Sequence, residues 1–381
     1  MTVTAGAPAT ATAPRAQPDA EDFFPVIGFD HLEFYCGNAK QAALFYERCF
    51  GFRRVAYRGL ETGERERASH VLEQGKIRLV LSTALHPHHE IGRHVLRHGD
   101  GVKVIALQVP DAVRAYAAAT ARGATGVLAP TEERDEQGVL RRAAVQAYGD
   151  TWMAFVERGD YEGAFAPGFA RVESAPGPGV GLLSIDHVVG NVELGRMNYW
   201  VDWFANAMGF SQLMHFDDKQ ISTEYSALMS KVMQDGTGKV KFPINEPAEG
   251  KRKSQIEEYL EYYHGPGVQH VACTTRDIIG TVTQLRDNGI EFLRVPNTYY
   301  EELEGRVGKI DEPVEKLAEL GILADRDDDG YLLQIFTKPV EDRPTVFYEV
   351  IERHGARGFG EGNFKSLFEA IEREQAVRGN L

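Results

Sequence analysis

Apolar residues fall into short runs rich in Val, Ile, Phe and Tyr, and stretches with helical spacing lie between these runs. One run opens with Asp-His-Leu at residues 30–32, and a helical pattern follows at residues 39–49. A second run opens with Asp-His-Val at residues 186–188, and a helical pattern follows at residues 197–208. The alternation predicts strands and helices in turn, and the two similar openings predict a repeat.

Two later landmarks support an internal duplication. Residues 101–106 (Gly-Val-Lys-Val-Ile-Ala) are echoed by residues 267–272 (Gly-Val-Gln-His-Val-Ala), and a helical stretch follows each of them. Residues 151–158 and 345–353 then align on a shared Glu-Arg pair. Each half is therefore expected to contain a strand, a helix, several strands, a second helix and several further strands.

The chain has 381 residues, which is enough for two or three domains, and its composition suggests where they divide. Residues 1–20 are rich in Ala, Thr and Pro and have no apolar segment, which is typical of a disordered tail and not of a signal peptide. Residues 174–181 hold two prolines and three glycines, as exposed linkers do. We therefore expect an N-terminal domain at residues 21–173 and a C-terminal domain at residues 182–381.

Composition also narrows the classes of function. The net charge of −14 disfavours non-specific nucleic-acid binding, because an acidic surface repels phosphate backbones. No run approaches the ~18 apolar residues that a membrane span needs. The three cysteines contain no CxxC pair, which fits a reducing cytoplasm and argues against a zinc-thiolate site. A metal bound to this chain would have to use His and carboxylate ligands.

Superposing the two halves isolates three matched pairs of positions, namely His31 and His187, Val104 and His270, and Ala154 and Glu349. Only the second half offers two imidazoles and a carboxylate, each within a strand-like run whose side chains alternate between faces. Such a set leaves coordination positions open and is associated with non-haem Fe(II) oxygenases. A lone strand histidine is more often a core or surface residue, but a buried Glu is costly unless it is paired or bound to a metal.

Several stretches in the second half follow one another in a characteristic order. They are residues 186–191 (Asp-His-Val-Val-Gly-Asn), 242–247 (Phe-Pro-Ile-Asn-Glu-Pro), 253–256, 267–271, 333–339, 343–349 and 358–365 (Gly-Phe-Gly-Glu-Gly-Asn-Phe-Lys). In these stretches the chain resembles the 4-hydroxyphenylpyruvate dioxygenase family of the vicinal oxygen chelate superfamily, and the resemblance runs from about residue 24 to residue 381. It implies an α+β fold with two tandem domains, each a pair of βαβββ modules forming an open barrel-like sheet.

The resemblance also implies the residues of the site. The iron ligands of the family fall on His187, His270 and Glu349, the positions that the repeat isolates. Its catalytic polar residues match Ser226, with Ser230 as the alternative, and Asn245, Gln255, Gln269 and Gln334. Its substrate-binding residues match Phe336, Phe347, Phe359, Asn363 and Phe364. Without the resemblance, the amides would be assigned to the surface, and Phe347 would be as well explained by core packing.

The C-terminal segment has a pattern of its own. Phe364, Leu367, Phe368 and Ile371 have the spacing of an amphipathic helix, which we expect to pack on the second half. Because Phe364 begins this apolar stripe, we expect the first turn of the helix to close the pocket as a lid.

The chemistry implied by the resemblance uses one Fe(II) per chain and O2 as co-substrate. The small-molecule substrate is a 2-oxo acid that chelates the iron itself, so no separate 2-oxoglutarate is needed. Oxidative decarboxylation of 4-hydroxyphenylpyruvate, ring hydroxylation and side-chain migration would give homogentisate, as in tyrosine and phenylalanine catabolism. The resemblance further implies a homo-oligomer, which we expect to be a dimer.

Three other functions stay open on the sequence alone. 4-Hydroxymandelate synthase shares the fold, metal and substrate but oxygenates the benzylic carbon. An extradiol catechol dioxygenase would need His215 or His264 as an acid–base group. A metal-free binding module suits the first half, in which we expect no iron.

A histidine-rich segment at residues 86–98 also suggests zinc. It has no cysteine nearby and no counterpart in the second half, so we interpret it as a polar loop that enters a helix.

Overall fold

The structure is a computed structural model that describes residues 22–173, 179–216, 227–248 and 250–380. The tail predicted at residues 1–20 and residues 174–178 of the predicted linker lie outside the described residues. Among the described helices, none combines the length and the apolar character needed to cross a membrane.

The N-terminal half consists of two βαβββ modules. The first contains β1 (Gly28–Tyr35), α1 (Ala39–Cys49), β2 (Arg53–Arg58), β3 (Arg67–Gln74) and β4 (Ile77–Ala84), with the short 3-10 helix η1 (Leu60–Thr62) after β2. The second contains β5 (Gly101–Gln108), α3 (Ala112–Ala121), β6 (Gly126–Asp135), β7 (Gly138–Gln146) and β8 (Trp152–Glu157). Helix α2 (Glu90–His98) joins the modules, and the short strand β9 (Ala170–Arg171) follows them.

The C-terminal half repeats this plan. Its first module contains β10 (Ile185–Asn191), α4 (Met197–Met208), β11 (Ser211–Phe216), β12 (Ala227–Gln234) and β13 (Lys241–Ala248), and α5 (Gln255–Tyr263) leads to the second. The second module contains β14 (Gly267–Thr274), α6 (Ile278–Asp287), β15 (Leu323–Asp327), β16 (Gly330–Phe336) and β17 (Phe347–His354). Helices α7 (Thr298–Glu301), α8 (Leu303–Val307) and α9 (Val314–Leu320) are inserted before β15, and η2 (Glu361–Asn363) and α10 (Phe364–Val377) end the chain. The predicted α+β fold is confirmed, including the C-terminal helix.

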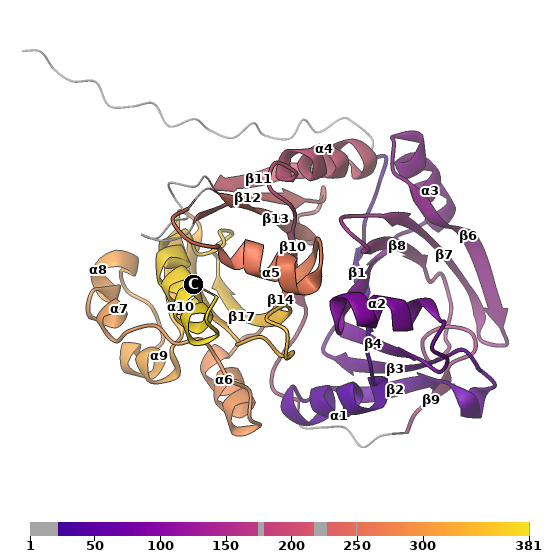
Figure 1. The fold of residues 1–381 in the computed structure, drawn as a ribbon, viewed down its shortest axis with the longest axis horizontal. Coiled ribbons are helices and arrows are strands. Elements are labelled where there is room, and N and C mark those ends of the chain that lie inside the picture. Colours follow the sequence, from indigo (N-terminus) through magenta and orange to yellow (C-terminus); the bar gives the residue numbers. More distant parts are fainter. Residues whose placement is uncertain (1–21, 174–178, 217–226, 249, 381) are drawn as a thin grey trace, which may run out of the picture.

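Each half forms one curved sheet, and the two sheets lie side by side (Figure 1). The strand orders are β6-β7-β8-β5-β1-β4-β3-β2-β9 and β11-β12-β13-β10-β14-β17-β16-β15. In the middle of each sheet the first strands of the two modules pair antiparallel, β1 with β5 and β10 with β14. Each sheet is thus built from two copies of one module that meet along their first strands.

The strand register agrees with the alignment of the two halves. His31 and Ala154 pair with the same residue of β5, and His187 and Glu349 pair with the corresponding residue of β14. A shift of one residue would turn every side chain to the other face of the sheet. The matched positions therefore face the interiors of their sheets in the same way.

The two halves share one continuous hydrophobic core beneath their helices. Phe29 of the first half packs edge-on against Phe242 of the second, with 5.8 Å between ring centroids. The buried Tyr348 hydroxyl donates a hydrogen bond of 2.8 Å to the Tyr46 hydroxyl across the same boundary. Because burial of apolar surface is the main stabilising term, each half depends on the other for part of its stability.

The interiors of the two sheets differ in what fills them. A compact apolar cluster fills the first and comprises Ala56, Val71, Val80, Val104, Ala106, Leu140, Ala144, Ala154, Val156, Phe165 and Ala166. Phe165 also packs edge-on against His31, with 5.1 Å between ring centroids. The second interior holds a cavity, which is described below.

The turn before β8 gives a test of how tightly the halves fit together. Gly149 has a φ of +58°, and a Cβ there would lie 2.2 Å from the carbonyl oxygen of Pro266 in the other half. Gly123 has a φ of +97° with no atom within 4 Å of such a Cβ. Gly123→Ala should therefore lower the free energy of unfolding by only about 1–2 kcal/mol, the steric cost of a Cβ in a left-handed backbone conformation. Gly149→Ala should lower the free energy of unfolding by more, as measured by chemical denaturation, and equal losses would contradict this fit.

Candidate metal centre and pocket

Three side chains on neighbouring strands converge in the second interior. His187 lies on β10, His270 on β14 and Glu349 on β17, and these strands are adjacent in this order. His187 Nε2 lies 3.1 Å and His270 Nε2 lies 3.4 Å from Glu349 Oε2. All three residues are buried. The structure therefore brings together the three residues expected to bind a metal.

The hydrogen bonds of the two imidazoles fix which nitrogen faces the centre. His187 Nδ1 lies 2.7 Å from Asp186 Oδ2, and His270 Nδ1 lies 2.9 Å from Gln269 Oε1. Both partners are acceptors, so each Nδ1 carries a proton, and in the neutral form each ring would direct its Nε2 lone pair towards Glu349. Glu349 Oε1 is itself buried without a hydrogen-bond partner among the described residues. Converging lone pairs around a carboxylate fit a divalent cation.

The charges around the centre favour the same occupant. Burial opposes ionisation of Asp186, but hydrogen bonds from His187 and Arg353 hold the pKa of this carboxyl far below its usual value. Burial also opposes the charge on Glu349, yet the His187 imidazole lowers the pKa of Glu349. Burial lowers the pKa of His270, so this ring is held neutral and able to act as a ligand. An ionised carboxylate in an apolar interior is stable only if a cation or proton compensates it.

A pocket with largely aromatic walls adjoins the three residues. Of the residues expected to form it, the lining includes Asn245, Gln255, Gln269, Phe336, Phe347, Phe359 and Phe364. Phe347 stacks on the His270 ring with 4.8 Å between centroids, and Phe359 lies edge-on to His187 at 4.9 Å. The rings therefore cover the three converging side chains, and a cavity lies beside them.

Three of the expected residues do not line this pocket. Ser226 lies outside the described residues, whereas its alternative Ser230 does line the cavity. Gln334 is buried on the same face of β16 as Phe336, and its amide Oε1 and Nε2 have no hydrogen-bond partner among the described residues. Asn363 is also buried, and its Oδ1 accepts a hydrogen bond of 2.6 Å from the Tyr299 hydroxyl. Neither Gln334 nor Asn363 is among the described residues that line the cavity.

Sequence reasoning missed part of the apolar lining. Leu228 and Val232 of β12 flank Ser230 with a period of two, and all three line the cavity. This alternation is the signal that identifies one face of a strand, and it could have been read from the sequence. Other unpredicted lining residues are Val189, Phe216 and Pro243.

Helix α10 covers the pocket with the face predicted from its apolar spacing. Phe364, Leu367, Phe368 and Ile371 all line the cavity. Beyond the helix, Arg378 binds both carboxylate oxygens of Glu258, a buried residue of α5, at 3.1 and 2.7 Å. The C-terminal segment is therefore fixed at both ends of its contact with the pocket.

The extradiol alternative loses support from the positions of its two candidate histidines. His215 on β11 and His264 after α5 are exposed, and neither lines the pocket. No histidine besides the two facing Glu349 is among the described lining residues.

The first half contains the same hydrogen-bonded layer of His, Asp and Arg side chains, but it has no second histidine and no glutamate at the matched positions. His31 Nδ1 lies 2.6 Å from Asp30 Oδ1, and Arg158 Nε donates to Asp30 Oδ2 at 2.6 Å. The second half has the same layer, in which Arg353 donates to both oxygens of Asp186 at 2.9 and 2.8 Å. This Asp–Arg pair was not predicted, although both residues belong to the landmarks that reveal the repeat.

Comparison with known proteins identifies the family. The model of the Glyoxalase/Bleomycin resistance protein/Dioxygenase superfamily matches residues 28–157 and 184–335. A 4-hydroxyphenylpyruvate dioxygenase from Aspergillus fumigatus is 48% identical over 93% of this chain and 94% of its own, and one from Danio rerio is 50% identical over 93% and 92%. A mutant of 4-hydroxymandelate synthase from Streptomyces coelicolor superposes with a TM-score of 0.83 at 34% identity, covering 92% of this chain and 99% of its own. The chain belongs to the 4-hydroxyphenylpyruvate dioxygenase family.

Proposed function

We propose that this chain is an Fe(II)-dependent dioxygenase that converts 4-hydroxyphenylpyruvate and O2 into homogentisate and CO2. The observation that carries the proposal is the buried group of His187, His270 and Glu349 beside an aromatic pocket. This group occurs in a chain that is nearly half identical, over almost its whole length, to enzymes of that name. One Fe(II) per chain would bind to these three residues.

The pocket suits a substrate that supplies its own metal ligands. When bound, Fe(II) offers positions to the carboxylate and keto oxygens of a 2-oxo acid and to O2, and it provides electrons for oxygen activation. No Lys or Arg is among the described lining residues, so these residues offer no cationic clamp for a separate 2-oxoglutarate. The carboxylate of the substrate would be held at the metal instead.

The side chains of this chain would bind and orient the phenol ring. Phe336 and Phe364 lie on opposite elements of the lining, β16 and α10, and offer apolar faces between which a flat ring can stack. Gln269 accepts a hydrogen bond from His270 through Oε1, which leaves its amide N–H groups to donate to the phenolic oxygen. Gln255, at the first position of α5, would be the second amide at that oxygen. Apolar walls also exclude water from the reacting ring.

Asp186 and Arg353 would act as positioning residues. Asp186 accepts the Nδ1 proton of His187, while Arg353 holds both carboxylate oxygens of Asp186 in place. This pairing keeps the His187 Nε2 lone pair directed at the metal position. Partners of this kind commonly change metal affinity by ~10–100-fold when they are removed.

4-Hydroxymandelate synthase remains the second candidate because a mutant of it superposes over most of this chain. Its identity of 34% is lower than the 45–50% found for the dioxygenases. Asn245 and Phe336 line the pocket and belong to the motifs that favour ring hydroxylation. We therefore prefer homogentisate as the product.

We also propose a cytoplasmic homodimer. The location is supported by the three cysteines, all of which are free thiols. The dimer rests on resemblance to the superfamily, and the mass of the particle in solution would test it.

The first test identifies the product. After anaerobic reconstitution with Fe(II), 4-hydroxyphenylpyruvate and then O2 should yield homogentisate, identified by mass spectrometry and NMR. His187→Ala should abolish turnover because it removes a ligand, whereas His31→Ala, at the matched position of the first half, should leave kcat and the iron content unchanged. Formation of 4-hydroxymandelate would show that the benzylic carbon is oxygenated and not the ring. An absence of O2 uptake would refute the proposal that the chain is a dioxygenase.

The Asp–Arg pair offers a test with a control built into the repeat. Asp186→Asn should weaken Fe(II) binding ~10–100-fold, because the neutral amide no longer fixes the Nδ1–H tautomer of His187. Asp30→Asn, which removes the same charge from the matched pair of the first half, should leave Fe(II) affinity unchanged. Equilibrium dialysis measures both affinities, and an equal loss in the two variants would contradict the positioning role.

The C-terminal segment gives the third test. Deletion of residues 362–381 should abolish turnover because it removes Phe364, Leu367, Phe368 and Ile371 from the pocket wall. Arg378→Ala releases only the contact with Glu258 and should reduce turnover less. Circular dichroism and iron content serve as controls for folding, and an unchanged turnover number in the truncated enzyme would end the proposal of a lid.

A further inference from the structure

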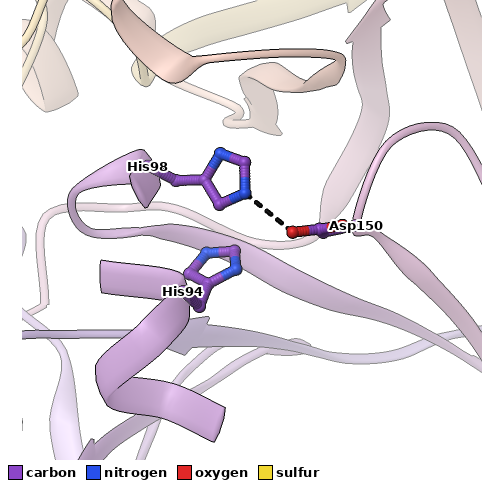
Figure 2. A group of neighbouring side chains, drawn as sticks. All are labelled: His94, His98 and Asp150. Atoms are coloured by element: carbon purple, nitrogen blue, oxygen red, sulfur yellow. Dashed lines mark hydrogen bonds and ion pairs between the residues drawn. The ribbon is translucent and has the colours of Figure 1, made fainter. Parts of the chain in front are cut away.

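A second group of potential ligands lies outside the pocket, near the boundary between the halves. His94 and His98 stand one helical turn apart on α2, and Asp150 lies in the turn before β8 (Figure 2). One ligand atom from each residue lies within 4.8 Å of the others. Both histidines are buried, at 6% and 2% exposure, while the Asp150 side chain is 44% exposed. The group is therefore enclosed by protein on one side and open to water at the carboxylate.

The hydrogen bonds of His98 leave an unusual pairing. Its Nδ1 contacts the carbonyl oxygen of Tyr263, which can only accept, so the proton resides on Nδ1. In a neutral ring the Nε2 then presents a lone pair to Asp150 Oδ2, 2.8 Å away. Two acceptors at this distance need a proton or a metal ion between them.

His94 distinguishes these two possibilities. Its Nδ1 and Nε2 are both buried without a hydrogen-bond partner among the described residues. Its ring lies below that of His98 in the view of Figure 2, with 4.6 Å between the ring centroids. A proton on His98 would satisfy His98 and Asp150 but leave His94 unpaired, at a cost of roughly 1–3 kcal/mol. A metal ion would bind one nitrogen of His94 together with His98 Nε2 and the Asp150 carboxylate.

Two cations lie near Asp150, but neither lies between the three side chains. The Arg97 guanidinium, 61% exposed, lies 4.0 Å from Asp150 Oδ2. The Lys103 ammonium donates to the backbone carbonyl of Asp150 and lies over the ring of Trp152. Neither interaction supplies a partner for His94.

We propose that His94, His98 and Asp150 bind a Zn(II)-class ion, with water as a further ligand. Imidazole and carboxylate ligands suit Zn(II), Co(II) and Ni(II), and bonds of ~2.0–2.2 Å bridge this group after small side-chain rotations. The contact of His98 with the Tyr263 carbonyl plays the part of an outer partner that orients a metal-binding imidazole. Because Tyr263 ends α5, the ion would brace the two halves together.

This site differs from the interior of the first sheet, in which we expect no iron. The loop followed by a helix that was predicted for residues 86–98 is present, since His89 caps α2 and Glu90 begins it. Asp150, which completes the group, lies far away in sequence. The proposal does not depend on the reaction assigned to the pocket.

Zinc analysis of the full chain tests the proposal. After removal of metals with a chelator and dialysis against Zn(II), the unaltered protein should hold two zinc ions per chain by mass spectrometry, one in each site. His187→Ala should hold one, His94→Phe should hold one, and the double variant none. His88→Ala, which alters an exposed histidine of the preceding loop, should still hold two.

A second variant keeps the test decisive if His94→Phe does not fold. Asp150→Asn changes a half-exposed turn residue and should also lose one zinc ion per chain. In the His187→Ala background, Zn(II) should raise the melting temperature, and adding Asp150→Asn should abolish this shift. A zinc content that stays unchanged when His94→Phe or Asp150→Asn is introduced, in the unaltered protein and in the His187→Ala background alike, would overturn the proposal.

Discussion

The burial of an ionised carboxylate, Glu349, is the constraint on which the rest of the catalytic half depends. A charge in an apolar interior is costly, and no backbone donor or side-chain cation is in contact with Glu349 among the described residues. Its compensation comes instead from the two imidazoles on the adjacent strands and from the cation that we propose these three residues bind. The adjacent order of β10, β14 and β17 follows from two modules meeting along their first strands.

The duplicated half shows which parts of this arrangement are structural. Asp30 and Arg158 orient His31 in the first half. In the second half, Asp186 and Arg353 orient His187 in the same way. This layer therefore forms whether or not the two other converging side chains are present. In the first half, small apolar residues and Phe165 occupy the interior. The Asp–Arg layer is therefore part of the module, whereas metal binding depends on the few side chains placed above it.

Sequence reasoning succeeded where the information was local and periodic. The repeat located the three side chains that converge, because a strand has a period of two and the register of both sheets is the same. It also located α10, whose apolar spacing is complete within a few turns. The roles of Gln334 and Asn363 stay predictions, because both are buried beside the turn at Gly360 and neither is among the described lining residues. The pairing of His98 with Asp150 was not visible, since it joins residues 52 positions apart through the fold.

The contrast between the two interiors also explains why one fold holds both a filled and an open sheet. Both halves place an aromatic ring against the histidine of β1 or β10, Phe165 against His31 and Phe359 against His187. After Phe165 the chain adds Ala166 to the apolar cluster, whereas after Phe359 it continues into α10, which spans the cavity and leaves the space beneath it open. The volume available for a substrate therefore depends both on the side chains that each sheet presents to its interior and on the segment that follows its last strand.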